Sequence, residues 1–370
     1  MDPVFRFADR LGPAKIVHVH EPGVGLHGTL VVDNVAAGPS IGGLRMATDV
    51  STEECFRLAR SMTLKNAAAG LPHGGGKSVL YGDPRMPSEE KECLVRAMAC
   101  ALGDVHDYIF GPDMGTDETC MAWVKAEIGR AVGLPRELGG IPLDELGATG
   151  FGLRSACEVA VQHCDFELAG ARVVVQGFGS VGIHAARFLA ERGAVLVAAS
   201  DSRGAVRSET GLDVEALVAL KRAGRSVAEH AEGERIERDA VVDVESEIWI
   251  PAARPDVIRS DNVGRLRTKL VVSGANIPMT DDAEKSLHER GVLCVPDFIA
   301  NAGGVICAAM EYHGSTETAA FEAIDERIRA NTEQVLEESK RRRILPRQAA
   351  VELSQRRVER AMGYRRWSIF

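Results

Sequence analysis

The 370-residue sequence has no run of about eighteen apolar residues, so no part of it is expected to span a membrane. Its first residues, MDPVFRFADRLGPAK, include acids and lack an apolar signal core, which argues against export. The formal net charge is −9, and this lack of a basic excess argues against nucleic acid as the main partner. The sequence therefore predicts a soluble protein that binds neither membranes nor nucleic acids.

The eight cysteines form no CxxC pair and show none of the spacings typical of metal ligands. His18 and His20 would share one face of a strand, but no cluster of acids or cysteines accompanies them. We therefore expect no metal site. Reduced cysteines, together with the lack of a signal segment, predict a cytoplasmic protein.

The length of the chain exceeds one ordinary core and predicts two domains. In the first part, KIVHVH and GTLVVDN alternate as strands do, and residues 52–69 follow with helical spacing. Beyond about residue 147, the apolar run ARVVVQ precedes a glycine turn, a helix predicted over 180–192 and a second apolar run, AVLVAAS. This strand, helix and strand form a βαβ unit, which requires a parallel sheet with both faces covered.

The predicted fold class is therefore α/β, with two domains. We expect an N-terminal α/β domain over 1–146 and a Rossmann-type, doubly wound dinucleotide-binding domain over 147–300. The last seventy residues, 301–370, are predicted to be helical and to pack back on the first domain.

A dinucleotide site is predicted where Gly177-Phe178-Gly179-Ser180-Val181-Gly182 follows a strand and opens a helix. Gly177 permits the tight turn, Gly179 lets the backbone approach a pyrophosphate, and Gly182 allows helix and strand to pack closely. Ser180 and Val181 lie at the helix N-terminus, whose free N–H groups attract phosphate. A glycine turn that binds nothing is the alternative interpretation.

The coenzyme is predicted from the end of the next strand. Asp201 lies nineteen residues after Gly182, where a carboxylate would bind the ribose hydroxyls and favour NAD. Ser202 and Arg203 follow directly and could accept the additional phosphate of NADP. We therefore predict NAD as the coenzyme and keep NADP open.

Two lysines lie near glycine-rich backbone in the segment LKNAAAGLPHGGGKSVLYGDP. Lys65 and Lys77 suit an anionic substrate held close to the chain, and a partly desolvated lysine can polarise water or a carbonyl. A phosphate loop is excluded because the motif requires glycine where Leu71 stands. From the residues alone, two solvated surface lysines remain an equal alternative.

Several segments occur together in this chain: GGLRMA (42–47), MTLKNAAAGLPHGGGK (62–77), GPDMGTDE (111–118), ATGFG (148–152), VQGFGSVG (175–182), SGAN (273–276) and DFIANAGGV (297–305). In order and spacing they resemble the glutamate/leucine/phenylalanine/valine dehydrogenase family. The resemblance implies NAD(P)-dependent oxidative deamination of an L-amino acid to its 2-oxo acid and ammonia, and the reverse reaction.

The resemblance also implies roles for individual residues. Lys65 would bind the substrate carboxylate, Lys77 would activate the attacking water, and Asp113 would move protons on and off the amino nitrogen. Asn276 would lie near the substrate carboxylate and the coenzyme, and Thr149 would contact the nicotinamide amide. The side-chain pocket would be lined by Ile41, Gly42, Gly43, Met62, Val305 and Ala308.

The pocket residues predict the substrate side chain. Glutamate-specific members usually carry a lysine just before the GlyGly pair and a serine on the helix after NAGGV, where this chain has Ile41 and Ala308. Burying a distal carboxylate without partners costs several kcal/mol, so we expect a neutral aliphatic substrate such as leucine or valine. Glutamate is the alternative, because SDSRG and SGANIP resemble the glutamate-type members, and His73 or Arg45 could reach an acid. An aromatic or unusual amino acid is a third alternative.

Two functions of other classes remain as alternatives. A 2-hydroxy-acid dehydrogenase would use a His/Arg pair and would not need Lys65 and Lys77. A non-catalytic, cofactor-sensing protein of the same fold would be expected to lose Lys77 or Asp113, and both are present. The family resemblance further predicts a homo-oligomer.

Overall fold

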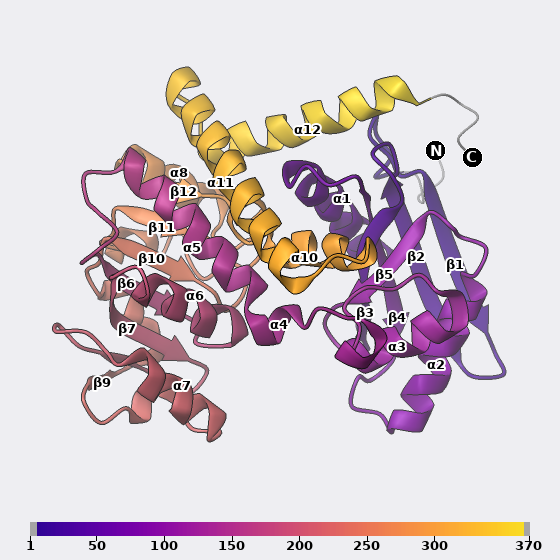
Figure 1. The fold of residues 1–370 in the computed structure, drawn as a ribbon, viewed down its shortest axis with the longest axis horizontal. Helices are drawn as coiled ribbons and strands as arrows, with labels where there is room; N and C mark the ends of the chain where they lie inside the picture. Colours follow the sequence, from indigo (N-terminus) through magenta and orange to yellow (C-terminus); the bar gives the residue numbers. More distant parts are fainter. Residues whose placement is uncertain (1–5, 366–370) are drawn as a thin grey trace. The chain divides into compact units, whose positions relative to one another are not determined.

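The computed structural model describes residues 6–365 and divides the chain into two compact units. The first unit holds the described residues up to Pro142, Val305–Ala320 and those from Val351 on. The second unit holds Leu143–Gly304 and Phe321–Ala350. Both units combine helices with a sheet, as the α/β fold class predicts (Figure 1).

The sheet of the first unit has five strands in the order β1-β2-β4-β3-β5. The strands β1 and β2 form an antiparallel pair, and β2 pairs antiparallel with β4. The strand β3 lies between β4 and β5 and runs parallel to both, so the carboxyl ends of β3, β4 and β5 point the same way. The bounds are β1 Lys15–Glu21, β2 Leu26–Asn34, β3 Ser40–Ala47, β4 Gly74–Tyr81 and β5 Tyr108–Pro112.

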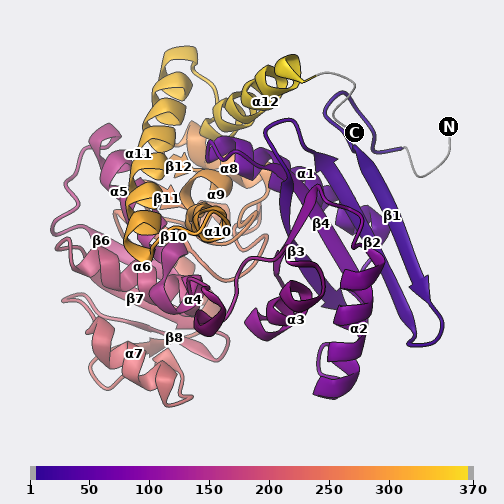
Figure 2. The same cartoon turned by 45° about the vertical axis from the view of Figure 1, so that its right-hand side comes forward.

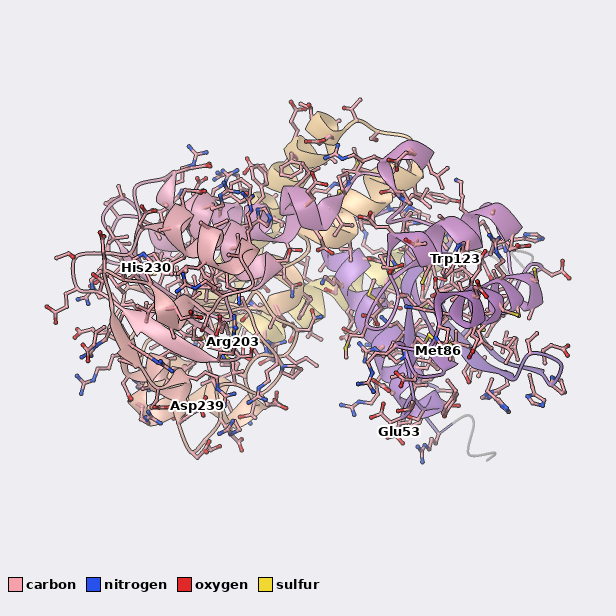
Figure 3. The ribbon with its side chains drawn as sticks, turned by 90° about the horizontal axis from the view of Figure 1, so that it is seen from below. Glu53, Met86, Trp123, Arg203, His230 and Asp239 are labelled. Carbon is pink, nitrogen blue, oxygen red and sulfur yellow. The ribbon has the colours of Figure 1, made fainter. Side chains whose placement is uncertain are left out.

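Alternation along these strands divides their side chains between two helical layers. Leu30 and Leu80 pack in the cluster with α2 and α3, against which Met86 and Trp123, labelled in Figure 3, also lie. The next residue on the same strand faces the other way, as Val31 does, and packs with α1. The two layers on opposite faces of the sheet can be followed in Figure 2. The helices are α1 Thr52–Ala68, α2 Ser88–Ala101 and α3 Glu118–Ile128.

The sheet of the second unit has seven strands in the order β12-β11-β10-β6-β7-β8-β9. The strands from β12 to β7 are all parallel, whereas β8 and β9 add an antiparallel edge. The bounds are β6 Arg172–Gln176, β7 Val195–Asp201, β8 Gly204–Arg207, β9 Glu234–Ile236, β10 Ile248–Pro251, β11 Leu270–Val272 and β12 Leu293–Val295.

Both faces of this second sheet are covered, as a parallel sheet requires. Val174, Trp249 and Val271 share a core with α8 and two short 3-10 turns, while α5 and α6 pack on each other and on the remaining face. The helices are α4 Leu143–Leu146, α5 Ala148–Ala160, α6 Ser180–Ala190, α7 Val214–Arg222, α8 Asp281–Glu289 and α9 Asp297–Ala300. The 3-10 turns are η5 Arg238–Asp243 and η6 Val263–Arg265.

The C-terminal segment differs from the prediction that 301–370 as a whole packs back on the first domain. Three helices follow, α10 Gly303–Tyr312, α11 Glu317–Arg342 and α12 Pro346–Tyr364, and the segment alternates between the two units. Residues 321–350 belong to the second unit because their charges are satisfied there. Asp325 accepts a hydrogen bond from Ser155 (2.6 Å), and Arg347 pairs with Glu284 (2.5 Å) and Asp297 (2.9 Å).

Among residues 6–365, no helix combines the length and the apolar character needed to cross a membrane. All eight cysteines lie in the described part of the chain and are free thiols.

Candidate active site

An ion pair in the first unit joins the middle of β4 to the residue that follows β5. Lys77 Nζ is 2.5 Å from Asp113 Oδ2, and the two side chains are 7% and 20% exposed. They are 36 positions apart in the chain but come together because β3 pairs with β4 on one side and with β5 on the other. Two residues that the sequence singled out separately therefore form one charged centre.

Arg45, on β3, is a second cation at this centre. Its Nε donates to Asp113 Oδ2 (3.0 Å), and its Nη1 donates to Glu54 on α1 (2.6 Å). Burial alone would raise the pKa of Asp113, but the charges of Lys77 and Arg45 hold that pKa below its usual value. Asp113 is therefore ionised at neutral pH and lies between two cations.

The GlyGly pair allows Asp113, Lys77 and the backbone of β4 to approach β3 closely. A Cβ at position 43 would lie 2.7 Å from Asp113 Cβ and 3.1 Å from Lys77 Nζ. A Cβ at position 42 would lie 1.8 Å from the carbonyl oxygen of Gly76, so the neighbouring strands require glycine there as well. Tyr108 fixes this part of the backbone, because its hydroxyl donates a hydrogen bond to the Gly42 carbonyl (2.7 Å).

The other predicted substrate residues of the first unit lie on α1, β3 and α10. Lys65 and Met62 are half-buried on α1, and Ile41 is buried on β3. Asn66 Nδ2 donates to the Gly74 carbonyl (2.7 Å), which ties the last turn of α1 to the start of β4. Val305 and Ala308 belong to the part of α10 in the first unit, half-buried and buried respectively.

Glu311 anchors this part of α10 through a buried carboxylate. Its oxygens accept hydrogen bonds from the backbone N–H groups of Gly133 (2.8 Å), Leu134 (3.2 Å) and Ile141 (2.9 Å). His73 adds a second link, because its Nε2 lies 3.0 Å from Nε2 of His313, just beyond α10. The other ring nitrogen of His73 is 3.0 Å from the Pro39 carbonyl, so both nitrogens have partners.

The glycine turn of the second unit fits a dinucleotide. Gly177 has φ +99°, and a Cβ there would lie 2.7 Å from the backbone of Ala253. Gly182 packs against the turn itself, because a Cβ would lie 2.1 Å from the Gly177 carbonyl oxygen. At Gly179, in contrast, a Cβ would meet nothing within 4 Å, so the backbone is open to an approaching group. This open position at a helix N-terminus suits a pyrophosphate.

A cavity of about 390 Å³ adjoins this turn. It lies wholly within the second unit, at the carboxyl ends of its central strands. The lining residues are Gln176, Gly177, Phe178, Gly179, Ser200, Asp201, Ser202, Lys221, Arg238, Asp239, Ala252, Ala253 and Arg254. The predicted residues Asp201 and Ser202 are therefore at the cavity, whereas Arg203 is not among its lining residues.

Asp201, predicted to bind the ribose, already accepts four hydrogen bonds from the protein. Oδ2 accepts from Lys221 Nζ (2.8 Å) and the Val227 N–H (3.1 Å). Oδ1 accepts from Ser226 Oγ (2.9 Å) and the Arg203 N–H (2.9 Å). Burial opposes ionisation, but these donors lower the pKa of Asp201 to about 2. The carboxylate is thus ionised and largely neutralised by its own surroundings.

The remaining predicted cofactor residues also lie in the second unit. Thr149 is half-buried in the first turn of α5, and Val181 is half-buried at the start of α6. Ser180 Oγ donates to the Asp144 carbonyl (3.2 Å). Asn276 is exposed, and its Oδ1 accepts a hydrogen bond from Asn301 (3.0 Å).

The sequence analysis missed several charged residues that lie at the Lys77–Asp113 centre or at the cavity of the second unit. Arg45 stands in the matched segment GGLRMA but was weighed only as a partner for a distal acid, not for Asp113. Three cations at the cavity come from segments that contain no recognisable motif, and only the tertiary fold brings them together. They are Lys221, Arg238 and Arg254. Their basic character is the one signal that the sequence offered.

Models of a protein family match nearly the whole chain. Residues 139–366 match the model described as glutamate/leucine/phenylalanine/valine dehydrogenase, and residues 13–130 match its dimerisation domain. The chain belongs to the glutamate/leucine/phenylalanine/valine dehydrogenase family. It is an NAD(P)-dependent amino-acid dehydrogenase, as the matched segments predicted.

Individual relatives agree with this membership. An NADP(+)-dependent glutamate dehydrogenase of Pyrobaculum calidifontis is 40% identical, over 77% of this chain and 72% of that protein. An NAD-specific glutamate dehydrogenase of Staphylococcus aureus is 35% identical, over 90% and 85%. Among solved structures, the leucine-bound hetero-hexameric glutamate dehydrogenase of Thermus thermophilus superposes with a TM-score of 0.83 at 29% identity, covering 94% of this chain and 89% of that one.

Proposed function

We propose that this dehydrogenase oxidatively deaminates an L-amino acid at the centre formed by Lys77, Asp113 and Arg45. The observation that carries the proposal is the ion pair of 2.5 Å between Lys77 and Asp113, beside Gly43, where a Cβ would lie 3.1 Å from Lys77 Nζ. An enclosed lysine and carboxylate in contact are the groups needed to activate water and to move protons at a nitrogen.

Each residue has a distinct task in the proposed reaction. Lys65, a half-buried cation, binds the α-carboxylate of the substrate. After oxidation at Cα, the Lys77 ammonium orients and polarises the water that adds to the iminium carbon, and the ionised Asp113 carboxylate takes up the proton that this water loses. Asp113 then gives that proton to the amino nitrogen. As the C–N bond breaks, the new hydroxyl group becomes the carbonyl and returns its proton to Asp113, and ammonia leaves. Arg45 holds the Asp113 carboxylate in place, because its Nε donates to Oδ2, the oxygen that also contacts Lys77.

The second unit carries the residues that would hold the coenzyme, which would supply the acceptor for the hydride from Cα. Gly177 and Gly179 form the turn for the pyrophosphate, and the cavity of about 390 Å³ would take the adenosine end. Thr149 and Asn276 are proposed to contact the nicotinamide end.

Two candidates remain for the substrate side chain, and glutamate has the broader support. Relatives at 35–40% identity are named glutamate dehydrogenases. The neutral candidate, leucine or valine, rests on Ile41, which is 4% exposed and offers no charge to a distal carboxylate. His73 and Arg45, the two side chains considered for holding a distal acid, are both engaged by protein partners.

The discriminating experiment is the initial rate of NADH and NADPH oxidation with ammonia against a panel of 2-oxo acids. The panel holds 2-oxoglutarate, 4-methyl-2-oxopentanoate, 3-methyl-2-oxobutanoate and phenylpyruvate. A higher kcat/KM for 2-oxoglutarate establishes glutamate, and a higher value for either branched acid establishes the neutral candidate. Absence of ammonia-dependent turnover with every oxo acid would refute the proposed reaction.

The variant Ile41→Lys sharpens this test. If position 41 faces the substrate side chain, a lysine there raises the ratio of 2-oxoglutarate to branched-acid kcat/KM by at least tenfold. Val31→Ile, a change at a buried position on the α1 face of β2, serves as the control and should leave that ratio within twofold. An unchanged ratio in Ile41→Lys would show that position 41 does not line the pocket.

We further propose that the chain forms a homo-oligomer in the cytoplasm. The first matched domain is described as a dimerisation domain, and the Thermus relative is a hexamer. The eight free cysteines suit a reducing compartment. Light scattering that gives the monomer mass of 39.7 kDa would contradict the assembly, and recovery in the exported fraction of the native host would contradict the compartment.

A further inference from the structure

The cavity beside the glycine turn carries more positive than negative side chains. Three cations and two carboxylates are among its lining residues. The cations are Lys221, Arg238 and Arg254, and the carboxylates are Asp201 and Asp239. This surplus of positive charge matters because NADP differs from NAD by one phosphate, on the 2′-oxygen of the adenosine ribose. In this fold that ribose binds at the end of the strand that follows the glycine turn.

Two of the three cations are already paired. Lys221 contacts Asp201 at 2.8 Å, and Arg238 contacts Asp239 at 2.8 Å. The second pair is exposed and therefore weak, since its side chains are 45% and 79% accessible (Asp239 is labelled in Figure 3). Arg254 makes no hydrogen bond or ion pair that the structure shows within residues 6–365. It is therefore the cation at this cavity that a ligand can engage without breaking a protein contact.

The carboxylate that usually disfavours a 2′-phosphate is neutralised by protein groups in this structure. A carboxylate at the end of the strand after the glycine turn normally binds the ribose hydroxyls and repels a 2′-phosphate. Here four protein donors occupy the oxygens of Asp201, Lys221 among them. The carboxylate therefore offers few acceptor positions to a ribose, and its charge is offset by an adjacent ammonium group.

A second cavity adjoins the first, and buried polar atoms without hydrogen-bond partners lie on its lining residues. It measures about 220 Å³ and shares Gln176, Arg238, Asp239 and Arg254 with the first. Trp249, which is 1% exposed, also lines it, and its Nε1 lacks a hydrogen-bond partner in the structure. Oε1 of Gln176, which borders both cavities, is likewise buried without a partner. Buried donors and acceptors left in this way require water or a ligand.

We propose that this enzyme selects NADP(H) over NAD(H), and that Arg254, with Arg238 and Ser202, binds the 2′-phosphate. The inference rests on the proposed function, since it assigns the coenzyme of that reaction. A guanidinium group matches a phosphate with two parallel hydrogen bonds, and Ser202 adds a hydroxyl donor at the end of β7. Membership of the family does not decide the question, because relatives of both specificities match this chain.

The test measures binding directly, without amino acid or oxo acid. The Kd values of NADPH and NADH are determined on the intact protein by the quenching of tryptophan fluorescence, and 2′,5′-ADP and 5′-AMP are used as competitors. Wild-type protein should bind NADPH at least tenfold more tightly than NADH, and 2′,5′-ADP more tightly than 5′-AMP. Raising the salt concentration should weaken NADPH binding more than NADH binding.

Matched variants locate the phosphate. Arg254→Gln should raise the Kd of NADPH at least tenfold and leave that of NADH within twofold. Arg207→Gln is the control, because Arg207 is exposed, is absent from the cavity lining and pairs with Glu234 (2.7 Å). It should leave both values within twofold. Arg203→Gln tests the competing assignment, and a larger loss of NADPH binding in Arg203→Gln than in Arg254→Gln would overturn the assignment of the phosphate ligand.

The outcomes separate this inference from the proposed function. Binding of both coenzymes with NADH at least as tight as NADPH, together with ammonia-dependent turnover, overturns the inference and leaves the reaction standing. Binding of neither coenzyme overturns both. Tighter binding of NADPH that is lost in Arg254→Gln supports the inference whatever amino acid proves to be the substrate.

Discussion

Replacing Asp113 by asparagine tests the centre of the proposed mechanism. The substitution keeps the shape of the side chain but removes the charge that lies 2.5 Å from Lys77 Nζ and 3.0 Å from Arg45 Nε. Lys77 is only 7% exposed and would become an enclosed cation without a counter-charge, whereas Arg45 would keep its pair with Glu54 (2.6 Å). Breaking a buried pair in this way costs about 3–5 kcal/mol, and the partial exposure of Asp113 favours the lower end, about 3 kcal/mol.

The effect on catalysis should exceed the effect on folding. An amide cannot take up and return the proton at the substrate nitrogen, and general acid–base groups typically contribute 10²–10⁴-fold. We therefore expect kcat of Asp113→Asn to fall by roughly 10²–10⁴. The binding of the coenzyme should stay within about twofold, since its predicted residues lie in the second unit.

The assay combines steady-state kcat, coenzyme binding and urea unfolding on the same preparations. Asp117→Asn is the matched control, because Asp117 caps α3 four residues further on and asparagine caps a helix equally well. The control should keep kcat within twofold. A kcat for Asp113→Asn within about threefold of wild type would refute the role of Asp113 in proton transfer, whatever happened to stability.

Three further predictions follow from the same structure. Gly43→Ala should lower kcat/KM at least tenfold with little change in coenzyme Kd, because its Cβ would lie 3.1 Å from Lys77 Nζ; wild-type kinetics would show that the space beside Lys77 is not used. Glu311→Ala should destabilise the protein to urea by about 2–4 kcal/mol, since three buried N–H groups lose their acceptor; Glu311→Gln should retain part of this stability, and an equal loss in both would point to charge instead. The third concerns acid: the pKa of Asp201 is lowered from 3.8 to about 2, so its contribution to stability is complete above pH 3.8 and is lost as the pH falls towards 2. Between pH 4 and pH 2, wild type should therefore lose more stability than Asp201→Asn, by at most about 2 kcal/mol, and parallel curves would contradict the shifted pKa.

Much of the fold could be predicted from local patterns. The glycine turn between two apolar runs predicted β6, α6 and β7 because a βαβ unit is contiguous in sequence and each part carries its own periodicity. The strand β3 was harder to recognise, since glycines at positions 42 and 43 interrupt its apolar pattern. The structure gives the reason for these glycines: the strand runs against the Gly76 carbonyl and the Asp113 side chain, where no Cβ fits.

The C-terminal segment shows what local sequence patterns could not predict. The helical character of residues 301–370 was visible in the sequence, but its division between two units was not. That division depends on single long-range contacts such as Arg347 with Glu284 and Asp297, and on Glu311 with backbone N–H groups. Buried charges go where partners satisfy them, and the spacing of residues along a helix does not reveal those partners.

The sequence by itself determined the family, the α/β class with a Rossmann-type sheet, and the reaction type, because contiguous motifs carry them. Only the tertiary structure decided how the charges are used. It placed Arg45 beside Asp113, occupied Asp201 with four internal donors, and brought Arg238 and Arg254 from separate segments of the chain to the cavity beside the glycine turn. A motif records which residue stands at a position, whereas the free energy of a charge depends on the groups that folding places within a few ångströms of it.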